Sequence, residues 1–294
     1  MAAPEDAGLR LDAYLAARGA APSRAAAQRL IEEGAVAVDG HPRAKNHRLA
    51  AGQAVTVAEA ADAEAPDEAA PAVEVVLEDD HLLVVDKPAG LVTHPAPGHR
   101  GATLADALPG RVVHRLDRDT SGLLLVAKTE AVRRALQAEL RARRVRREYL
   151  ALVSGHPDAE TGTIDAPLGR DRRRRTLMST RTDVPRHAVT HFEVVRRLPR
   201  TALLRVRLET GRTHQIRAHL AAIDHPVCGD PTYGGLACGR RLGLERQFLH
   251  ATFLMFRHPV TGEMEVCESK PPVDLRRALD VAIREPVSGG PDGD

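Results

Sequence analysis

The chain contains little of what several classes of protein need. Among its 294 residues there is no Trp, and there are only 3 Tyr and 4 Phe, so a single-strand binder built on successive aromatic platforms is not expected. The three cysteines, Cys228, Cys238 and Cys267, include no Cys-x-x-Cys pair and leave an odd count. This pattern favours reduced thiols over a disulfide framework or a zinc site.

Several other signals are missing from the sequence. It has no run of about 18 apolar residues and no apolar stretch near its start, so we expect a cytoplasmic protein without a membrane partner. It has no Walker A loop, no dinucleotide-binding glycine motif, no hydrolase elbow and no zincin motif. His214, His219 and His225 lie close together, but their spacing does not match the one-turn spacing of a helical zinc pair. We therefore expect no cofactor and no metal.

Charge is distributed unevenly along the chain. The formal net charge is only +2, yet residues 61–80 hold eight acidic residues and no Lys or Arg, and residues 111–217 hold 25 basic residues against 12 acidic ones. Such a basic segment is typical of a surface that binds a polyanion. The alternative is a solvated basic face without a ligand.

Residues 9–57 have the pattern of a small module of two helices followed by short strands. Helices are predicted near 9–15 and at 24–33, and strands are predicted around a turn at Asp39-Gly40 and at 54–57. The pattern resembles the S-four RNA-binding domain, and the resemblance is carried by Leu11-Asp12, Ser23-Arg24, Ile31, Gly34 and Val36–Gly40. It implies that Arg24 and Gln28 on the second helix bind RNA. The alternative is an amphipathic helix pair without a ligand.

The rest of the chain divides into a linker, a larger domain and a tail. Residues 58–72 contain only Ala, Glu, Asp and Pro, which predicts an acidic flexible linker. In residues 73–285 strands are predicted at 73–77, 82–85, 123–126, 149–153, 189–195 and 202–208, and helices at 130–144 and 213–223. Because strands and helices do not alternate regularly, we predict an α+β domain with a mixed sheet. Residues 286–294 are expected to be disordered.

The segment 114–122 places a carboxylate among cations just before an apolar strand. Asp117 is flanked by His114, Arg115 and Arg118, which would favour its ionised form and could hold phosphates. Loops held by a rigid sheet often carry catalytic groups. From these residues alone, Asp117 is equally well read as a salt bridge that orders the loop.

The segment 114–129, with the sequence HRLDRDTSGLLLVAKT, resembles the signature of the RluA/RluD-type pseudouridine synthases. Further segments match the same family in the same order, and together they span 73–270: 86–95, 147–153, 211–219, 225–234, 247–251 and 257–259. The resemblance implies isomerisation of uridine to pseudouridine in RNA, without cofactor or metal. A catalytic domain that follows an S-four module is also the domain order of many members of this family.

The resemblance also implies roles for individual residues. Asp117 matches the essential aspartate, which is proposed either to attack C1′ or to take a proton from C2′. Tyr149 matches the tyrosine that stacks on the target uracil and is proposed to help remove the C5 proton. Arg217 matches the arginine that pairs with the aspartate. Arg115 matches the arginine that fills the gap left by the flipped uridine.

Other residues are expected to contact RNA outside the catalytic centre. His114 and Arg118 lie on either side of Asp117 within the segment 114–122, the predicted catalytic loop, and Arg172, Arg173 and Arg174 lie where the family has an RNA-facing loop. One departure from the family is Asp86, which replaces the usual Asn before Lys-Pro. We interpret this change as lying on a substrate-side loop.

The sequence therefore predicts a monomeric pseudouridine synthase that acts on structured RNA, with large-subunit rRNA as the first choice. A tRNA substrate and a non-catalytic RNA-binding assembly factor are the alternatives. A glycoside hydrolase is disfavoured because it needs a second positioned carboxylate, and Asp119 matches no such role.

Overall fold

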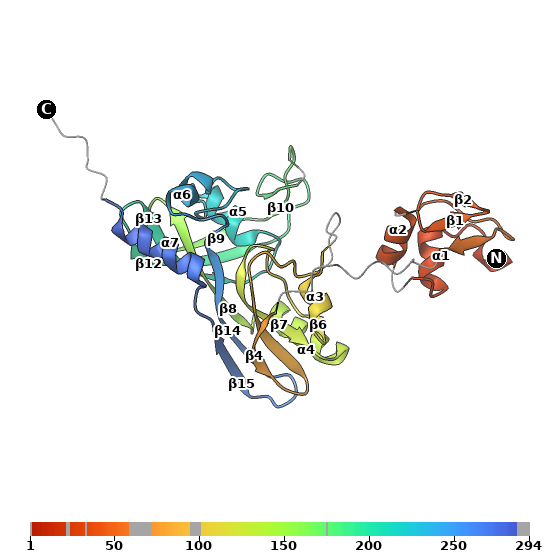
Figure 1. Cartoon of the computed structure of the whole chain (residues 1–294), viewed down its shortest axis with the longest axis horizontal. Coiled ribbons are helices and arrows are strands. Elements are labelled where there is room, and N and C mark those ends of the chain that lie inside the picture. The colour runs from red at the N-terminus through yellow and green to blue at the C-terminus, as the bar shows by residue number, and fades with distance from the viewer. Residues whose placement is uncertain are drawn as a thin grey trace. The chain divides into compact units, whose positions relative to one another are not determined.

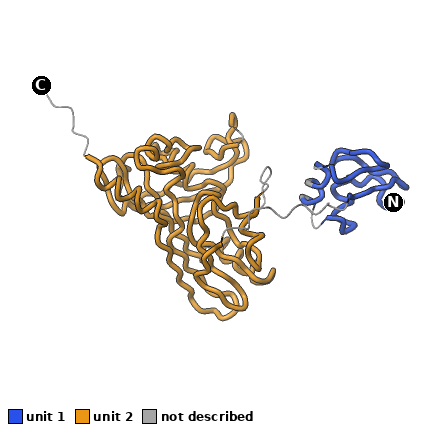
Figure 2. Tube along the Cα trace, viewed as in Figure 1, with its two compact units in different colours: residues 1–67 blue, residues 68–294 orange. Residues whose placement is uncertain are grey.

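The computed structural model describes residues 2–21, 24–32, 34–58, 72–94, 101–174 and 176–286. The chain forms two compact units, Met1–Asp67 and Glu68–Asp294, which are described separately (Figure 2). The predicted linker and tail lie outside the described residues except for Ala58, Ala72 and Pro286. None of the described helices is both long and apolar enough to cross a membrane.

Unit 1 consists of two helices and a small antiparallel sheet. A short 3-10 helix, η1 (Pro4–Asp6), precedes α1 (Leu11–Ala17) and α2 (Arg24–Glu32), and the sheet has the order β2-β1-β3 with strands β1 (Val36–Val38), β2 (His41–Pro42) and β3 (Val55–Val57). Asp39 and Gly40 both have positive φ, as a two-residue hairpin turn requires. Leu11, Leu15 and Val38 form part of the buried core. The predicted helix–helix–strand order is confirmed.

A buried carboxylate links the two helices of unit 1. Asp12 is fully buried and accepts hydrogen bonds from Arg10, Arg24 and Gln28, the last at 2.7 Å. Burial alone would raise the pKa of Asp12, but these three donors outweigh burial and hold the pKa well below its usual range. Arg24 and Gln28, predicted to bind RNA, therefore have a structural partner inside their own unit.

Unit 2 is built on one large mixed sheet (Figure 1). Its main path runs β4-β5-β7-β14-β8-β13-β12-β9, while β15 pairs with β14 and β6 pairs with β7. Among the described strands of this sheet, the pairing of β7 with β14 is parallel and the other pairings are antiparallel. The strands are β4 (Glu74–Glu78), β5 (Leu82–Lys87), β6 (Arg111–Val112), β7 (Ser121–Ala127), β8 (Arg146–Ser154), β9 (Thr161–Asp165), β12 (Val189–Arg197), β13 (Thr201–Leu208), β14 (Leu249–Arg257) and β15 (Met264–Glu268).

Helices cover the sheet on both faces, and a hairpin stands apart from it. The helices are α3 (Leu104–Ala107), α4 (Glu130–Arg141), α5 (Gln215–Ala222), α6 (Leu236–Arg241) and α7 (Val273–Arg284), and the hairpin consists of β10 (Gly169–Arg170) and β11 (Met178–Ser179). Alternate residues of β5 and β7 enter two separate hydrophobic clusters, since successive strand residues point to opposite faces. Helices α5, α6 and α7 pack in one cluster and α4 in the other.

The predicted α+β class is confirmed, and the predicted elements are found with shifted ends. The helix predicted at 130–144 ends at Arg141 because Arg143 adopts a positive φ of 60°, which a continuing helix cannot contain. Strands β14 and β15 and helices α6 and α7 had not been predicted. Gly122 explains the contact of β7 with β14, since a Cβ there would lie 2.3 Å from the Ala251 carbonyl oxygen.

Lys87, at the end of β5, is a fully buried cation. Its Nζ donates hydrogen bonds to the carbonyl oxygens of Pro88, Leu91 and Arg118 at 2.8, 2.9 and 2.9 Å. Burial lowers the pKa of Lys87 to about 7. Because Arg118 belongs to the predicted catalytic loop, Lys87 fastens this loop to the end of β5.

Replacing Lys87 with Met should destabilise unit 2. The change removes three hydrogen bonds and leaves the carbonyl group of the buried Leu91 without this donor, so we expect the free energy of unfolding to fall by about 2–4 kcal/mol. Urea denaturation measures this loss. The matched control is Lys128→Met, which removes only an ion pair with Glu78 at the surface and should cost less than about 1 kcal/mol. An equal loss of unfolding free energy in the two variants would show that the hydrogen bonds of Lys87 stabilise unit 2 no more than a surface ion pair does.

Acid should weaken unit 1 through the protonation of Asp12. Because the folded-state pKa of Asp12 lies below the unfolded value of about 3.9, its stabilisation is present above that pH and is lost as the pH falls through and below it. Hydrogen exchange of peptides from residues 2–58, corrected for intrinsic rates, measures the loss. In Asp12→Asn we expect weaker protection at neutral pH and a smaller further loss in acid. An acid response identical to that of the wild type would contradict the role of Asp12.

Candidate active site

A cavity of about 320 Å³ opens where the catalytic loop meets the middle of the sheet. It is lined by residues from five parts of unit 2: the segment before β7, the end of α4, strand β8, the segment from the end of β13 into α5, and the start of β14. Asp117, Tyr149 and Arg217, the three predicted catalytic residues, all line it. Residues far apart in the sequence are thus brought to one site.

Arg217 of α5 lies between two carboxylates. Its Nε and Nη2 donate to the two oxygens of Asp230 at 2.6 and 2.9 Å, and its Nη1 donates to Asp117 Oδ2 at 3.0 Å. Burial alone would lower the pKa of Arg217, but Asp230 and Asp117 outweigh burial and raise it above its usual value. The predicted pairing of Arg217 with Asp117 is present in the structure.

Asp230 is a site residue that sequence reasoning missed. It is fully buried and also accepts backbone N–H bonds from Thr232 and Tyr233. With its bidentate contact, Asp230 fixes the plane of the Arg217 guanidinium and leaves Nη1 for Asp117. The segment 225–234 matched the family in the sequence, so the position of the acidic Asp230 within this segment was the signal that could have identified it.

Tyr149 lies on the cavity side of β8. Its side chain is buried, and burial raises the pKa of its phenol, so the hydroxyl stays protonated at neutral pH. Arg147, two residues earlier on the same strand, also lines the cavity, whereas Arg146 and Glu148 line a different depression. This division follows the alternation of side chains along a strand.

The catalytic loop presents one exposed cation to the cavity. Arg115 is exposed and lines it. Arg118 is also exposed, but it pairs with Asp119. His114 accepts a hydrogen bond at Nε2 from the Leu125 backbone N–H, and burial together with Arg147 lowers its pKa to about 3. His114 is therefore neutral at physiological pH, and its description as a cation was wrong.

The three predicted RNA-contacting arginines of the basic run lie between β10 and β11. Arg172 pairs with Asp183, and the backbone N–H groups of Arg173 and Arg174 donate to Asp171. A second cavity, of about 600 Å³, lies between this hairpin and residues 211–214, which also line the active-site cavity. The hairpin therefore adjoins the catalytic centre.

Tyr233 connects the hairpin to the catalytic ion pairs. Its hydroxyl accepts the Met178 backbone N–H at 3.1 Å and bonds His214 Nδ1 at 3.1 Å. The Arg217 guanidinium lies over its ring, 5.2 Å from the centroid. His219 and His225 have structural partners instead, Thr190 and Ala166 for the first and the Ser154 carbonyl for the second.

The interpretation of Asp86 as a substrate-side residue was wrong. Asp86 lies in β5 and accepts a hydrogen bond from the Ser269 hydroxyl, which also bonds His250 Nε2 at 3.0 Å. His250 Nδ1 in turn bonds the Ser121 hydroxyl at 3.0 Å. Asp86 therefore belongs to an internal network that reaches Ser121, four residues after Asp117.

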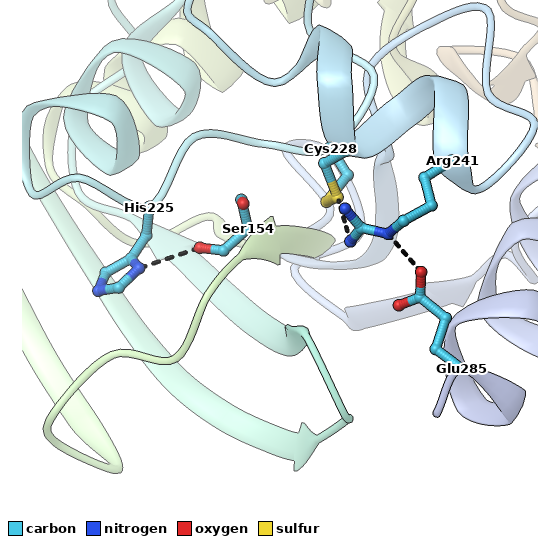
Figure 3. Close-up of a disulfide and its surroundings, with 6 residues drawn as sticks. Ser154, His225, Cys228, Arg241 and Glu285 are labelled. Atoms are coloured by element: carbon cyan, nitrogen blue, oxygen red, sulfur yellow. Dashed lines mark hydrogen bonds and ion pairs between the residues drawn. A yellow bond between two sulfur atoms is a disulfide. The ribbon is translucent and has the colours of Figure 1, made fainter. Parts of the chain in front are cut away.

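The prediction that all three cysteines are free thiols was also wrong. Cys228 and Cys238 form a disulfide, and Cys267 is free and buried. The disulfide links the segment that carries Asp230 to α6, and Arg241 of α6 contacts Cys238 Sγ and pairs with Glu285 (Figure 3). The spacing of ten residues gave no sign of this pairing, because it depends on the turn between the two cysteines.

Comparison with known proteins gives this arrangement a family. A family model described as RNA pseudouridylate synthase matches residues 81–222, and an S4 domain model matches residues 9–55. An uncharacterized RNA pseudouridine synthase of Mycobacterium bovis is 40% identical over 94% of each chain. A ribosomal large subunit pseudouridine synthase D of Xanthomonas campestris pv. campestris is 41% identical over 95% of this chain and 90% of that protein.

Solved structures agree with this assignment. The structure of Human RNA Pseudouridylate Synthase Domain Containing 4 has a TM-score of 0.59 and 25% identity, over 72% of this chain and 93% of its own. Human RNA Pseudouridylate Synthase Domain Containing 1 has a TM-score of 0.57 and 30% identity, over 68% of this chain and 84% of its own. The chain belongs to the RNA pseudouridine synthases, which are isomerases, and its N-terminal module is an S4 domain.

Replacing Asp230 with Asn should lower both stability and activity, although Asp230 is not among the residues that line the cavity. Arg217 would keep only one carboxylate partner, so we expect the stability of unit 2 to fall by about 3–5 kcal/mol and kcat for pseudouridine formation to fall by roughly 10²-fold. Urea denaturation and an RNA modification assay measure the two effects. Glu160→Gln, which removes an exposed ion pair with Arg197, is the control and should change neither. Wild-type activity in Asp230→Asn would refute the positioning role.

Proposed function

We propose that the protein converts specific uridines of structured RNA to pseudouridine, and that its substrate is large-subunit rRNA. The observation that carries the proposal is the carboxylate of Asp117, held by Arg217 at the wall of a cavity that also contains Tyr149. Relatives named ribosomal large subunit pseudouridine synthase D support the choice of rRNA, since three of them are about 40% identical over most of this chain.

Asp117 has the geometry of a reacting group. One carboxylate oxygen is bonded to Arg217, and the side chain is 15% exposed toward the cavity, so the carboxylate can meet a ribose while its charge is balanced. In the reaction the N1–C1′ bond breaks, a C5–C1′ bond forms, and the C5 proton is replaced by one at N1. Asp117 can attack C1′ or remove a proton from C2′, and both routes start from its ionised form.

Tyr149 is better suited to bind a flat base than to remove the proton at C5 of that base. Because its phenol stays protonated, the ring offers an apolar face for uracil and the hydroxyl offers a hydrogen bond. A uridine can reach this wall only after it leaves its stack. In this proposal Arg115, which is exposed and lines the cavity, occupies the vacated position in the RNA.

The hairpin β10–β11 and the S4 domain supply the wider RNA surface in this proposal. Arg173 and Arg174 donate their backbone N–H groups to Asp171, which shapes the turn that presents them. Arg24 is about half exposed although it pairs with Asp12, so it can contact a phosphate while it also holds the helix pair together.

Asp117→Ala should abolish product formation while it leaves RNA binding nearly intact. The assay is tritium release from RNA labelled at C5 of uracil, with transcribed large-subunit rRNA and tRNA as separate substrates. Asp158→Ala, a change in an exposed turn after β8, is the matched control. We expect release from rRNA with the wild type and the control, and none with Asp117→Ala.

Three other outcomes would overturn parts of the proposal. Tritium release from tRNA alone would show that the substrate is tRNA and not rRNA. Tight rRNA binding by the wild type without any release would favour an assembly factor. Substantial tritium release by Asp117→Ala would show that Asp117 does not take part in the reaction.

A further inference from the structure

We propose that Arg147 binds a phosphate of the target nucleotide inside the active-site cavity. This inference rests on the proposed function and adds a substrate-positioning residue to it. Arg147 was part of a matched segment, but neither the sequence nor the comparisons give it a role.

The first observation is that Arg147 is a buried cation. Its exposed fraction is 8%, and no hydrogen-bond partner of its buried Nε is found in the described part of the chain. No ion pair of its guanidinium with a carboxylate is found among the described residues. An uncompensated buried charge is costly, so a site that retains one is arranged to receive an anion.

The second observation is that Arg147 is directed to the place where substrate would lie. It shares the cavity face of β8 with Tyr149, two residues along the strand, a rise of about 7 Å. A Cβ added to Gly211 would lie 3.1 Å from Arg147 Nη1. The absence of a side chain at Gly211 therefore leaves room for the guanidinium at the cavity wall.

The third observation is that the carboxylates of the cavity are already engaged. Asp117 is bonded to Arg217, which is shared between Asp117 and Asp230. Glu209, which also lines the cavity, pairs with Arg143 and His191. Arg212 donates to the His187 carbonyl oxygen. Arg147 instead acts on the cavity through its charge, since it helps to lower the pKa of His114 and opposes the rise in the pKa of Tyr149.

A phosphate is the anion that matches these features. The guanidinium offers a planar fork of N–H donors that fits phosphate oxygens in pairs, and every internal nucleotide of an RNA carries a phosphate on each side. A neutral uracil carbonyl would leave the buried charge uncompensated. With uracil on Tyr149 and ribose at Asp117, the phosphate is the remaining part of the nucleotide for Arg147 to bind.

The test compares Arg147→Met with Arg146→Met. Arg146 is adjacent in the chain but lies on the other side of the strand, where it pairs with Glu148 and contacts the Phe253 ring. The probes are tritium release and filter binding with transcribed large-subunit rRNA over a series of KCl concentrations. Urea denaturation checks the stability of each variant.

For Arg147→Met we expect kcat/KM to fall about 10- to 100-fold, with stability equal to or above that of the wild type because a buried charge is removed. The slope of log(kcat/KM) against log[KCl] should become shallower by about 0.7–1, as the loss of one phosphate contact predicts. Arg147→Lys should keep the slope but recover only part of kcat/KM, since it retains the charge and loses the fork. Arg146→Met should match the wild type in slope and kcat/KM.

Two results would overturn the inference, and a third would concern the proposed function alone. If Arg147→Met unfolds more easily and loses activity only in proportion, Arg147 is structural. If kcat/KM falls and the salt slope does not change, Arg147 contacts the base. If the wild type releases no tritium, the proposed function fails, and the salt slope for rRNA binding still decides whether Arg147 contacts a phosphate.

Discussion

The ion pairs of Arg217 determine the geometry on which the active site depends. The guanidinium of Arg217 joins Asp230, which is fully buried, to Asp117, which lies 100 residues before Arg217 in the chain. The bidentate contact with Asp230 fixes the orientation of the guanidinium, so the position of Asp117 is set by groups that do not react. Without this cation the two carboxylates would repel each other across a poorly solvated space.

The catalytic loop is fastened to the sheet at two points after Asp117. Lys87 holds the Arg118 carbonyl, and the network from Asp86 through Ser269 and His250 holds Ser121. Asp117 directly precedes the first of these points and lines the cavity. A reacting carboxylate needs such support, because misplacement by about 1 Å can cost two orders of magnitude in rate.

The sequence predicted the parts of this structure that depend on local patterns. Strands β5 and β7 were found from contiguous apolar residues, and Asp117, Tyr149 and Arg217 from motifs in the expected order. It could not predict Asp230, the disulfide between Cys228 and Cys238, or the neutral state of His114. Each of these depends on burial and on partners from distant segments, which composition and spacing do not contain. Asp86 was misread for the same reason, since its partner Ser269 lies 183 residues away.

Many of the basic residues in 111–217 have acidic partners within the fold and are not all available to bind RNA. Several of these arginines form ion pairs within the fold, such as Arg144 with Glu139, Arg197 with Glu160 and Arg205 with Glu193. Their charges are partly balanced before any RNA arrives, and exposed pairs of this kind contribute little to binding or stability.

The number of phosphates that the protein contacts should therefore be smaller than the 25 basic residues of this segment. The cations that remain for RNA are the ones without an acidic partner among the described residues. Arg115, which is exposed, and Arg147, which is buried, are of this kind, and both line the active-site cavity.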